Sequence, residues 1–359
     1  MSDSTHVGWC ANVLAADSVG GMVSGIQSVA GFIPPRTPVG LWIPESMLSL
    51  DLQPLLQWLA EQNCPVLGFN AFPQHAFHAP VVKEAVYLPH WADQSRLDYT
   101  CRAAAMLATM LGPNGVGGLT TVPIGWPSHD VDHDKAAASI RTACERIDVI
   151  GKETNTQLHL AIEPEPGCIL GTAMDLARFV DEHELNDLGR RGLLRACLDA
   201  CHLALMHESS DAAIAALAQS DISIGRLQLS SAPEARGKHF DDILALAEPR
   251  WLHQTSIHHN DSLTLLRDLS DAPTTNQSGV WRTHLHVPIH LDRIGDLHTT
   301  RESIVELITA ASTLDYRPAV EVETYAWSVL PAAIRKPTLG EDIAAELAWA
   351  TQTLREAGW

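Results

Sequence analysis

Acidic and imidazole side chains stand beside several short apolar runs of this sequence, where folding could bring them together. The run RACLDACH contains Asp199 and His202, three positions apart. The segment THLHVPIH alternates His284 with His286, and alternation along an extended chain puts both side chains on one face. Carboxylates and imidazoles gathered in this way can act as acids, as bases or as metal ligands.

Further polar residues lie at the ends of other apolar runs. Glu163 ends the strand-like part of LHLAIEPEP, Gln228 lies in IGRLQLSS, and Glu321 and Glu323 lie in PAVEVETYA. Carboxylates that converge in a partly dry site raise one another's pKa unless a cation offsets their charge. The set therefore predicts a divalent metal ion. Mixed His and carboxylate ligands favour zinc, manganese, cobalt or iron over calcium, and magnesium is a further candidate.

Each of these residues also has a simpler interpretation. Asp199 could cap a helix, because an Asp carboxylate accepts hydrogen bonds from free backbone N–H groups. His284 and His286 could be ordinary packed or surface histidines among the 18 of the chain. Glu321 could pair with a neighbouring Lys or Arg, and Glu165, between two prolines, reads as a loop residue.

Short apolar runs alternate with helix-like segments through the whole chain, and this alternation is typical of βαβ units and a parallel sheet. Helix-like segments include LDYTCRAAAMLATML, HDKAAASIRTACERIDVIGKE and the last one, GEDIAAELAWATQTLREAG. The nine strand candidates are residues 6–14, 39–44, 65–72, 116–124, 158–166, 193–200, 224–231, 283–290 and 318–326.

The pattern favours an α/β fold, a (β/α)₈ TIM barrel, over a doubly wound sheet, because neither GxGxxG nor GxxxxGK[ST] occurs. A barrel needs eight strands, so one of the nine is a ligand-bearing connection, and a long polar stretch before it singles out 283–290. We expect residues 1–359 to form one domain with long loops after strand 3 (73–100) and strand 7 (231–283). Polar groups at the carboxyl ends of barrel strands are then site residues.

Composition restricts the partners. The 359 residues include 24 Lys and Arg against 43 Asp and Glu, a net charge of -19. Such a charge disfavours nucleic acid and anionic membranes and favours a small-molecule metabolite or a cation. We expect no membrane insertion and, because seven scattered cysteines and no signal peptide are seen, a cytoplasmic protein. The oligomeric state stays open.

The loop after the third strand is predicted to cover the barrel mouth and to touch the substrate. It is longer than most βα connections and rich in aromatic and polar residues. His75 and His78 are predicted substrate contacts there, as is His284 elsewhere. Lys83 and Arg96 are expected to hold an anionic group, the alternative being ion pairs with Glu84 and Asp93.

Longer motifs carry a resemblance to a known family. They are WCANV, GFNAFPQHAFHAPVVKEAVYLPHW followed by RLDYT, TTVP, CLDACH, HLHVP and VEVETYAWSVLP. With these the sequence resembles the xylose isomerase-like TIM-barrel superfamily, which includes sugar isomerases, ketose 3-epimerases and the endonuclease IV group. Within it the sequence is most similar to EboE-type metabolite-traffic proteins, and the motifs spread over nearly the whole chain.

The resemblance implies a ligand set at the matching positions. Glu163 would be the fifth-strand carboxylate, Asp199 and His202 the sixth-strand pair, and Gln228 the seventh-strand ligand. HLH stands where endonuclease IV-like members have Asp-x-His, so that His286 fits the pattern and His284 departs from it. In the last strand Glu323 matches the superfamily carboxylate better than Glu321.

The resemblance also implies the chemistry. In the isomerases and epimerases the metal polarises substrate oxygens while carboxylates move a proton, roles that would fall here to Glu163 and Glu323. The expected function is that of a metal-dependent sugar isomerase/epimerase-like enzyme acting on a small polar or phosphorylated metabolite in an Ebo-type biosynthesis or export pathway. A phosphoester hydrolase related to endonuclease IV and a non-catalytic metabolite-binding protein are the alternatives.

Overall fold

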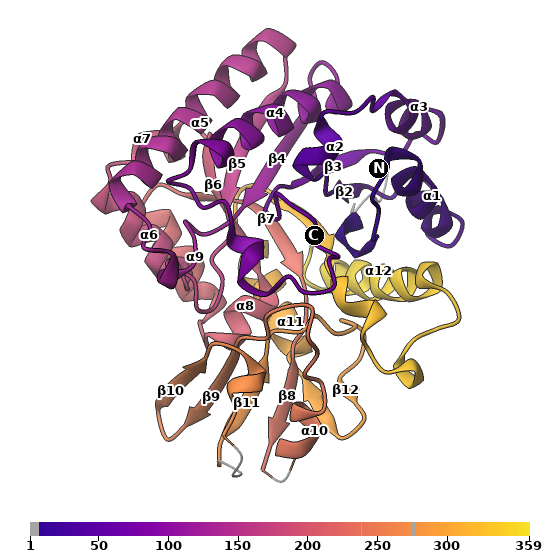
Figure 1. Ribbon diagram of the computed structural model, residues 1–359, viewed down its shortest axis with the longest axis vertical. Coiled ribbons are helices and arrows are strands. Elements are labelled where there is room, and N and C mark those ends of the chain that lie inside the picture. The colour runs from indigo at the N-terminus through magenta and orange to yellow at the C-terminus, as the bar shows by residue number, and fades with distance from the viewer. Residues whose placement is uncertain (1–6, 238, 274–277) are drawn as a thin grey trace.

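The computed structural model describes residues 7–237, 239–273 and 278–359, and its centre is a closed barrel of eight parallel strands. Around the barrel the strands follow the order β1-β14-β7-β6-β5-β4-β3-β2 (Figure 1). Their bounds are β1 Val7–Cys10, β2 Val39–Leu41, β3 Val66–Asn70, β4 Val116–Thr121, β5 Gln157–Ile162, β6 Leu194–Asp199, β7 Ser223–Leu229 and β14 Ala319–Val322.

Helices surround the barrel and bury their apolar faces against it in one large core. The longer ones are α1 Val19–Ala30, α3 Gln53–Glu61, α4 Gln94–Leu111, α5 His133–Thr154, α6 Ala173–Glu182, α9 Ser210–Gln219, α11 Arg301–Ser312 and α12 Leu339–Glu356. Shorter ones are α2 Glu45–Leu48, α7 Asn186–Arg190, α8 Ala200–Leu205 and α10 Phe240–Leu244. No helix within the described ranges combines the length and apolarity needed to cross a bilayer.

Local sequence fixes where these helices begin. Thr172 and Asp175 form a capping box at the start of α6, and Thr338 and Glu341 form another at α12. Asp132 caps α5 by accepting a hydrogen bond from the backbone N–H of Lys135. Such caps satisfy backbone donors that a helix leaves free at its first turn.

A buried ion pair fills the middle of the barrel. Arg226 of β7 donates to Glu321 of β14 over 3.0 Å, and neither side chain is more than 2% exposed. The second Arg226 terminus donates to the backbone carbonyl of Gly118. The pairing confirms the interpretation of Glu321 as the partner of a basic residue, because its carboxylate pairs with Arg226 inside the barrel.

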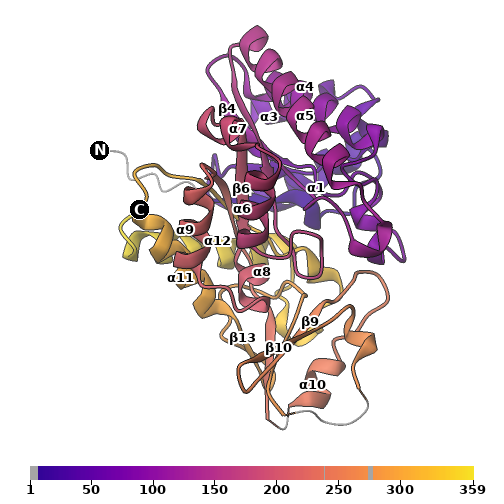
Figure 2. The same cartoon turned by 90° about the vertical axis from the view of Figure 1, so that its left-hand side faces the viewer.

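A second sheet is inserted between β7 and α11 and lies at the end of the barrel where the strands finish (Figures 1 and 2). It has six strands in the order β10-β9-β11-β8-β13-β12, and every pair in it is antiparallel. Their bounds are β8 Pro233–Arg236, β9 Thr255–His259, β10 Ser262–Leu266, β11 Val280–Thr283, β12 Arg293–Ile294 and β13 Leu297–Thr299.

The predicted barrel is confirmed, with one difference in the insertion. Eight of the nine strand candidates correspond to the barrel strands, of which β5 and β7 begin one residue before the predicted range, and residues 284–290 form a connection, as expected. The region 231–283 was expected to be a loop, but within its described residues, which exclude 238 and 274–277, it forms strands. These strands are short and partly exposed, so their apolar alternation is weak in the sequence.

A second apolar core joins the insertion to the barrel loops. Phe77 of the loop after β3, Trp251 of the insertion and Tyr325 after β14 meet with ring centroids 5.0–5.6 Å apart. Aromatic contacts at such distances add stability beyond the area they bury. Two loops and one inserted sheet therefore form a single wall above the strand ends.

Glu346 of α12 gives the first prediction. Its Oε1 accepts hydrogen bonds from the backbone N–H of Ile289 and the hydroxyl of Thr324, and its Oε2 is buried. Burial raises the pKa of Glu346 to about 8. Because the folded pKa exceeds the unfolded one, its contribution to stability is complete below about pH 4 and is lost as the pH rises through 8.

We therefore expect Glu346→Gln to flatten the fall in unfolding free energy between pH 5 and 8, measured by urea denaturation. The matched control is Glu356→Gln, an exposed position on the same helix, which should keep the wild-type slope. An unchanged slope in Glu346→Gln would contradict the assignment.

Candidate metal centre

Three carboxylates meet where the barrel strands end. Glu163 follows β5, Asp199 is the last residue of β6, and Glu323 follows β14. One carboxylate oxygen of each lies within 4.8 Å of the others, and all three side chains are at least 95% buried. The distances in sequence are large, so only barrel closure brings the three together.

Free acceptor atoms are concentrated in this cluster. Glu163 Oε2 and Asp199 Oδ2 are buried and have no hydrogen-bond partner among the described residues. Burial, followed by the charges of neighbouring carboxylates, raises the pKa of Glu163 and of Glu323 well above the usual range. A divalent cation would relieve both the missing partners and the repulsion.

Asp199 serves as a helix cap and as a member of the cluster. Its Oδ1 accepts from the backbone N–H of His202 over 3.0 Å, which caps α8, and from the Ser230 hydroxyl over 2.6 Å. Its Oδ2 stays free and lies 3.9 Å from Nε2 of His286. The cap and ligand interpretations of Asp199 are thus compatible, because each uses a different oxygen.

Three histidines border the carboxylates, and oxygen atoms anchor Nδ1 in each ring. His202 Nδ1 donates to the carbonyl of Pro164, and His286 Nδ1 donates to the carbonyl of Glu323. His284 Nδ1 donates to Oε1 of Gln254 over 2.9 Å. Each neutral ring therefore has its lone pair on Nε2, the arrangement in which a histidine binds metal.

These lone pairs converge. Nε2 of His202 lies 3.2 Å from Nε2 of His284, and Nε2 of His286 is buried without a partner in the part of the chain that the structure describes. Burial lowers the pKa of His202, and that of His286 to about 3. A contact of 3.2 Å between two ring nitrogens requires a proton or a cation between them, because two lone pairs at that distance repel.

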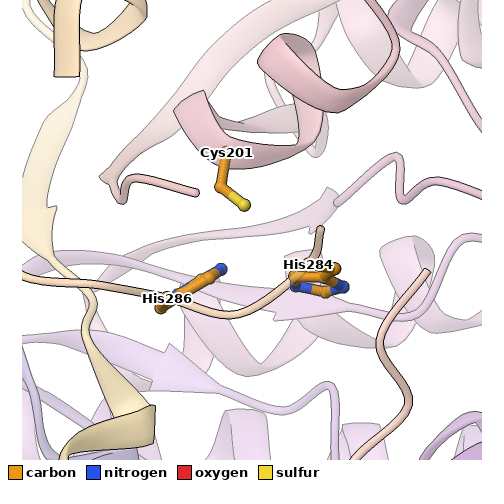
Figure 3. Close-up of side chains that lie close together, drawn as sticks. All are labelled: Cys201, His284 and His286. Atoms are coloured by element: carbon orange, nitrogen blue, oxygen red, sulfur yellow. The ribbon is translucent and has the colours of Figure 1, made fainter. Parts of the chain in front are cut away.

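Cys201 also borders the histidines. Its sulfur, from the first turn of α8, points toward the rings of His284 and His286 (Figure 3), and the three ligand atoms lie within 4.8 Å of one another. Burial, then the charges of Asp199 and Glu165, raises the pKa of the Cys201 thiol well above its usual value. The thiol is therefore protonated and packs as a small apolar group.

Gln228 lies deeper than the other predicted ligands. It is fully buried and is paired in register with Asp199 on one side and Glu321 on the other. Its Oε1 accepts a hydrogen bond from the thiol of Cys197 over 3.0 Å. An amide oxygen has two lone pairs, so this hydrogen bond leaves one lone pair of Oε1 for a metal.

A cavity opens directly above the carboxylates and holds about 530 Å³ of unfilled space, part of it open to solvent. Its floor is polar and its walls are largely aromatic and aliphatic. The walls come from the loop after β3, the insertion and the segment after β14. The wall residues are Phe72, Pro73, Phe77, Val86, Trp251, Leu252 and Tyr325.

The residues predicted to contact substrate fall into two groups. His284 and Lys83 line the cavity, and Lys83 donates to Asp268 of the insertion over 2.6 Å. His75 is exposed outside the cavity, and His78 donates to the backbone carbonyl of Asn12. Neither residue lines the cavity, so the structure does not place them where a substrate contact was expected.

Arg96 requires a larger correction. It lies on α4, fully buried, and donates to the carbonyls of Pro89, Ala71 and Phe72. Burial lowers its pKa to about 10. Arg96 therefore holds the loop after β3 in place instead of reaching a ligand, and it pairs with carbonyls instead of Asp93.

Sequence reasoning missed part of the site. Glu165, predicted to be a loop residue, is 95% buried in the cavity, where it accepts from the Tyr87 hydroxyl over 2.7 Å and from Gln254 over 2.9 Å. Asn12 and Asn70 both donate to Oε1 of Glu323. Asn12 follows β1, and Asn70 is the last residue of β3. Both could have been predicted in the same way as the carboxylates, because polar residues at strand ends are expected to be site residues.

Comparison with solved structures supports the barrel architecture, whereas comparison of the sequence finds no match. The chain matches no known family profile and no curated protein in sequence. Among solved structures, a xylose isomerase-like TIM-barrel protein from Mycobacterium smegmatis in complex with magnesium aligns over 99% of both chains, with 11% identity and a TM-score of 0.55. A D-tagatose 3-epimerase-like protein aligns over 98% of this chain and 99% of its own, with 10% identity and a TM-score of 0.56.

A third neighbour was solved with a sugar. The D-allulose 3-epimerase from Methylomonas sp. in complex with D-allulose aligns over 97% of this chain and 96% of its own, with 14% identity and a TM-score of 0.52. At these identities the likeness establishes the fold. The protein is a (β/α)₈ barrel, and the solved structures that share this fold include xylose isomerase-like proteins.

Proposed function

We propose that the protein is a metal-dependent enzyme of the sugar isomerase/epimerase-like type that acts on a small polar metabolite. The observation that carries the proposal is the set of buried, unpartnered ligand atoms at the cavity floor: Glu163 Oε2, Asp199 Oδ2 and His286 Nε2. Neighbours of the same fold were solved with magnesium and with a ketose, which supports this choice.

Glu163, Asp199 and Glu323 would hold the first cation, joined by Oε1 of Gln228. His202 and His286 share Asp199 with that group, since ligand atoms of these three also lie within 4.8 Å of one another, and would hold a second cation. Mixed nitrogen and oxygen ligands suit zinc, manganese, cobalt or iron, and carboxylates alone suit magnesium.

The bound metal would polarise neighbouring hydroxyl and carbonyl oxygens of the substrate. Glu163 follows β5 and Glu323 follows β14, and in the barrel these two strands are separated by β6 and β7. The two carboxylates would take and return a proton at the adjacent carbon of the substrate. Asn12 and Asn70 fix Glu323 in position through its Oε1. The aromatic walls would exclude water during the proton transfer.

The charge of the cavity lining also indicates which kind of substrate would bind. Its one cationic side chain, Lys83, is already paired with Asp268. Because Lys83 is already paired, this lining would fit an uncharged polar metabolite better than a sugar phosphate. The motifs shared with EboE-type proteins support a role in an Ebo-type pathway, and seven free cysteines among the described residues support a cytoplasmic location.

A phosphoester hydrolase is the second candidate. The adjoining His202, His284 and His286 favour it, because two neighbouring cations can stabilise the attacking and leaving oxygens of a phosphoester. Hydrolysis and proton transfer leave different products, so one experiment separates them. A metabolite carrier would give neither product.

The test uses purified protein loaded in turn with Mg²⁺, Mn²⁺, Co²⁺ and Zn²⁺. D-allulose and D-fructose in D₂O serve as probes for proton transfer, and bis(p-nitrophenyl) phosphate serves as the probe for hydrolysis. We expect carbon-bound deuterium in a recovered ketose, read by mass spectrometry, and a loss of about 10²–10⁴-fold in Glu163→Gln and Glu323→Gln.

Glu145→Gln is the matched control, since this residue is exposed on α5 and far from the cavity in the fold. Release of p-nitrophenol without deuterium uptake would replace the isomerase proposal by the hydrolase. Binding of a ketose without either reaction would show that the protein is a metabolite carrier and not an enzyme of either class.

A further inference from the structure

A second hollow opens at the opposite end of the barrel, where the strands begin. It holds about 620 Å³ and is lined by the first residues of several strands, among them His159 of β5 and Arg195 of β6. Arg226 and Arg317 complete its polar lining, which contains no Asp or Glu. In a chain with a net charge of -19, a concavity with only basic titratable groups would draw anions.

Two of the arginines carry charges that no carboxylate offsets. Within the described ranges Arg195 and Arg317 take part in no ion pair. Arg195 donates to the carbonyl of Gly192, and Arg317 donates to the carbonyls of Leu314 and Tyr316. Arg317 also lies over the ring of Trp359, 5.1 Å from its centroid. Arg226 is neutralised by Glu321, so Arg195 and Arg317 supply the free positive charge.

His159 faces the hollow without a hydrogen-bond partner for either ring nitrogen among the described residues, although it is 94% buried. Two glycines make room for it. A Cβ atom at Gly118 would stand 2.1 Å from Nε2 of His159, and one at Gly225 would stand 2.6 Å from it. A buried imidazole that lacks partners is costly unless a ligand or water provides them.

We propose that this hollow binds a small oxyanion, the phosphate or carboxylate group of a metabolite. Arg195 and Arg317 supply the charge, and His159 supplies an N–H donor. The site is separate from the metal centre, because His159 precedes Glu163 by four residues on one strand, roughly 13 Å at about 3.3 Å per residue. The Arg226–Glu321 pair lies between the two sites.

Burial, together with the positive charges of Arg195 and Arg226, holds the pKa of His159 well below its usual value. A bound anion would oppose these charges and raise that pKa. Anion binding should therefore be accompanied by an upward shift in the titration of one histidine, which a purely structural His159 would not show.

The experiment is calorimetric titration of the metal-free protein at low ionic strength, with inorganic phosphate and acetate as separate probes. Removing the metal keeps the outcome independent of the proposed enzyme activity. We expect saturable binding of at least one probe and a loss of about tenfold or more in Arg195→Gln and in Arg317→Gln, in line with one lost charge-assisted contact. Histidine titration by NMR should show the His159 signal shifting with the bound probe.

Arg190→Gln is the matched control, because Arg190 is exposed, pairs with Asp221 and does not line the hollow. Binding of phosphate alone would assign a phosphate ligand, and binding of acetate alone a carboxylate. The proposal is overturned if neither probe saturates, or if Arg195→Gln and Arg317→Gln, each with a wild-type melting temperature, bind as well as the unaltered protein.

Discussion

Asp199→Ala is expected to empty the metal centre. The variant removes one of the three carboxylates of the cluster, including the Oδ2 that has no partner among the described residues. Loss of a partner that only orients a ligand costs about 10–100-fold in metal affinity, so loss of a direct ligand should cost more than about 100-fold. Metal per chain, measured by inorganic mass spectrometry after dialysis, should fall close to zero.

A control variant, Asp132→Ala, separates the effect of losing a helix cap from the effect of losing a metal ligand. Asp132→Ala removes a capping Asp from α5, where the carboxylate accepts from Lys135 N over 3.0 Å and has no metal role. Both variants should lose about 1 kcal/mol of stability from the missing cap. Only Asp199→Ala should also lose the metal, and full metal content in that variant would refute the assignment.

Glu321→Gln is expected to destabilise the protein by about 3–5 kcal/mol, the usual result of removing one partner of a buried ion pair. It would leave the Arg226 guanidinium charged inside the barrel with no counter-charge. Urea denaturation measures the effect. We expect a single transition, because the core of Phe77, Trp251 and Tyr325 joins the inserted sheet to the barrel.

Two comparisons sharpen this prediction. Asp221→Asn breaks the exposed pair with Arg190 and should cost only about 0–1 kcal/mol. Replacing both buried partners, Arg226→Met with Glu321→Leu, should recover much of the lost stability, since an apolar pair needs no charge compensation. If the double variant is no more stable than Glu321→Gln, Arg226 contributes to stability through its other contacts. If Glu321→Gln unfolds in two separate transitions, the inserted sheet unfolds independently of the barrel.

The sequence was sufficient for the barrel because its signals are local. Each barrel strand is a short apolar run, and each is followed by a segment of helical period, so the order of elements could be read directly. The clustering of Glu163, Asp199 and Glu323 could be predicted for the same reason, since these residues lie where such runs end. Glu165 was missed because two flanking prolines look like a turn, whereas its partners Tyr87 and Gln254 come from distant segments.

The remaining errors concern contacts between distant parts of the chain. Arg96 has the residue type of an anion-binding group, and nothing near it in sequence shows that three backbone carbonyls would take up its hydrogen bonds. Lys83 likewise pairs with Asp268, which is 185 positions away. Burial and pairing of this kind are set by how the loops pack, so periodicity along the chain could not predict them.

Closure of the barrel also determines when the protein can fold during synthesis. β14 pairs with both β1 and β7, and Val7 meets Val320 in register. Until the ribosome has released β14, the first seven strands form an open sheet whose two outer strands, β1 and β7, expose unpaired backbone groups. Exposed strand edges pair with other chains. The insertion lengthens this interval, because the whole segment between β7 and α11 must be translated before the last strand can close the edge.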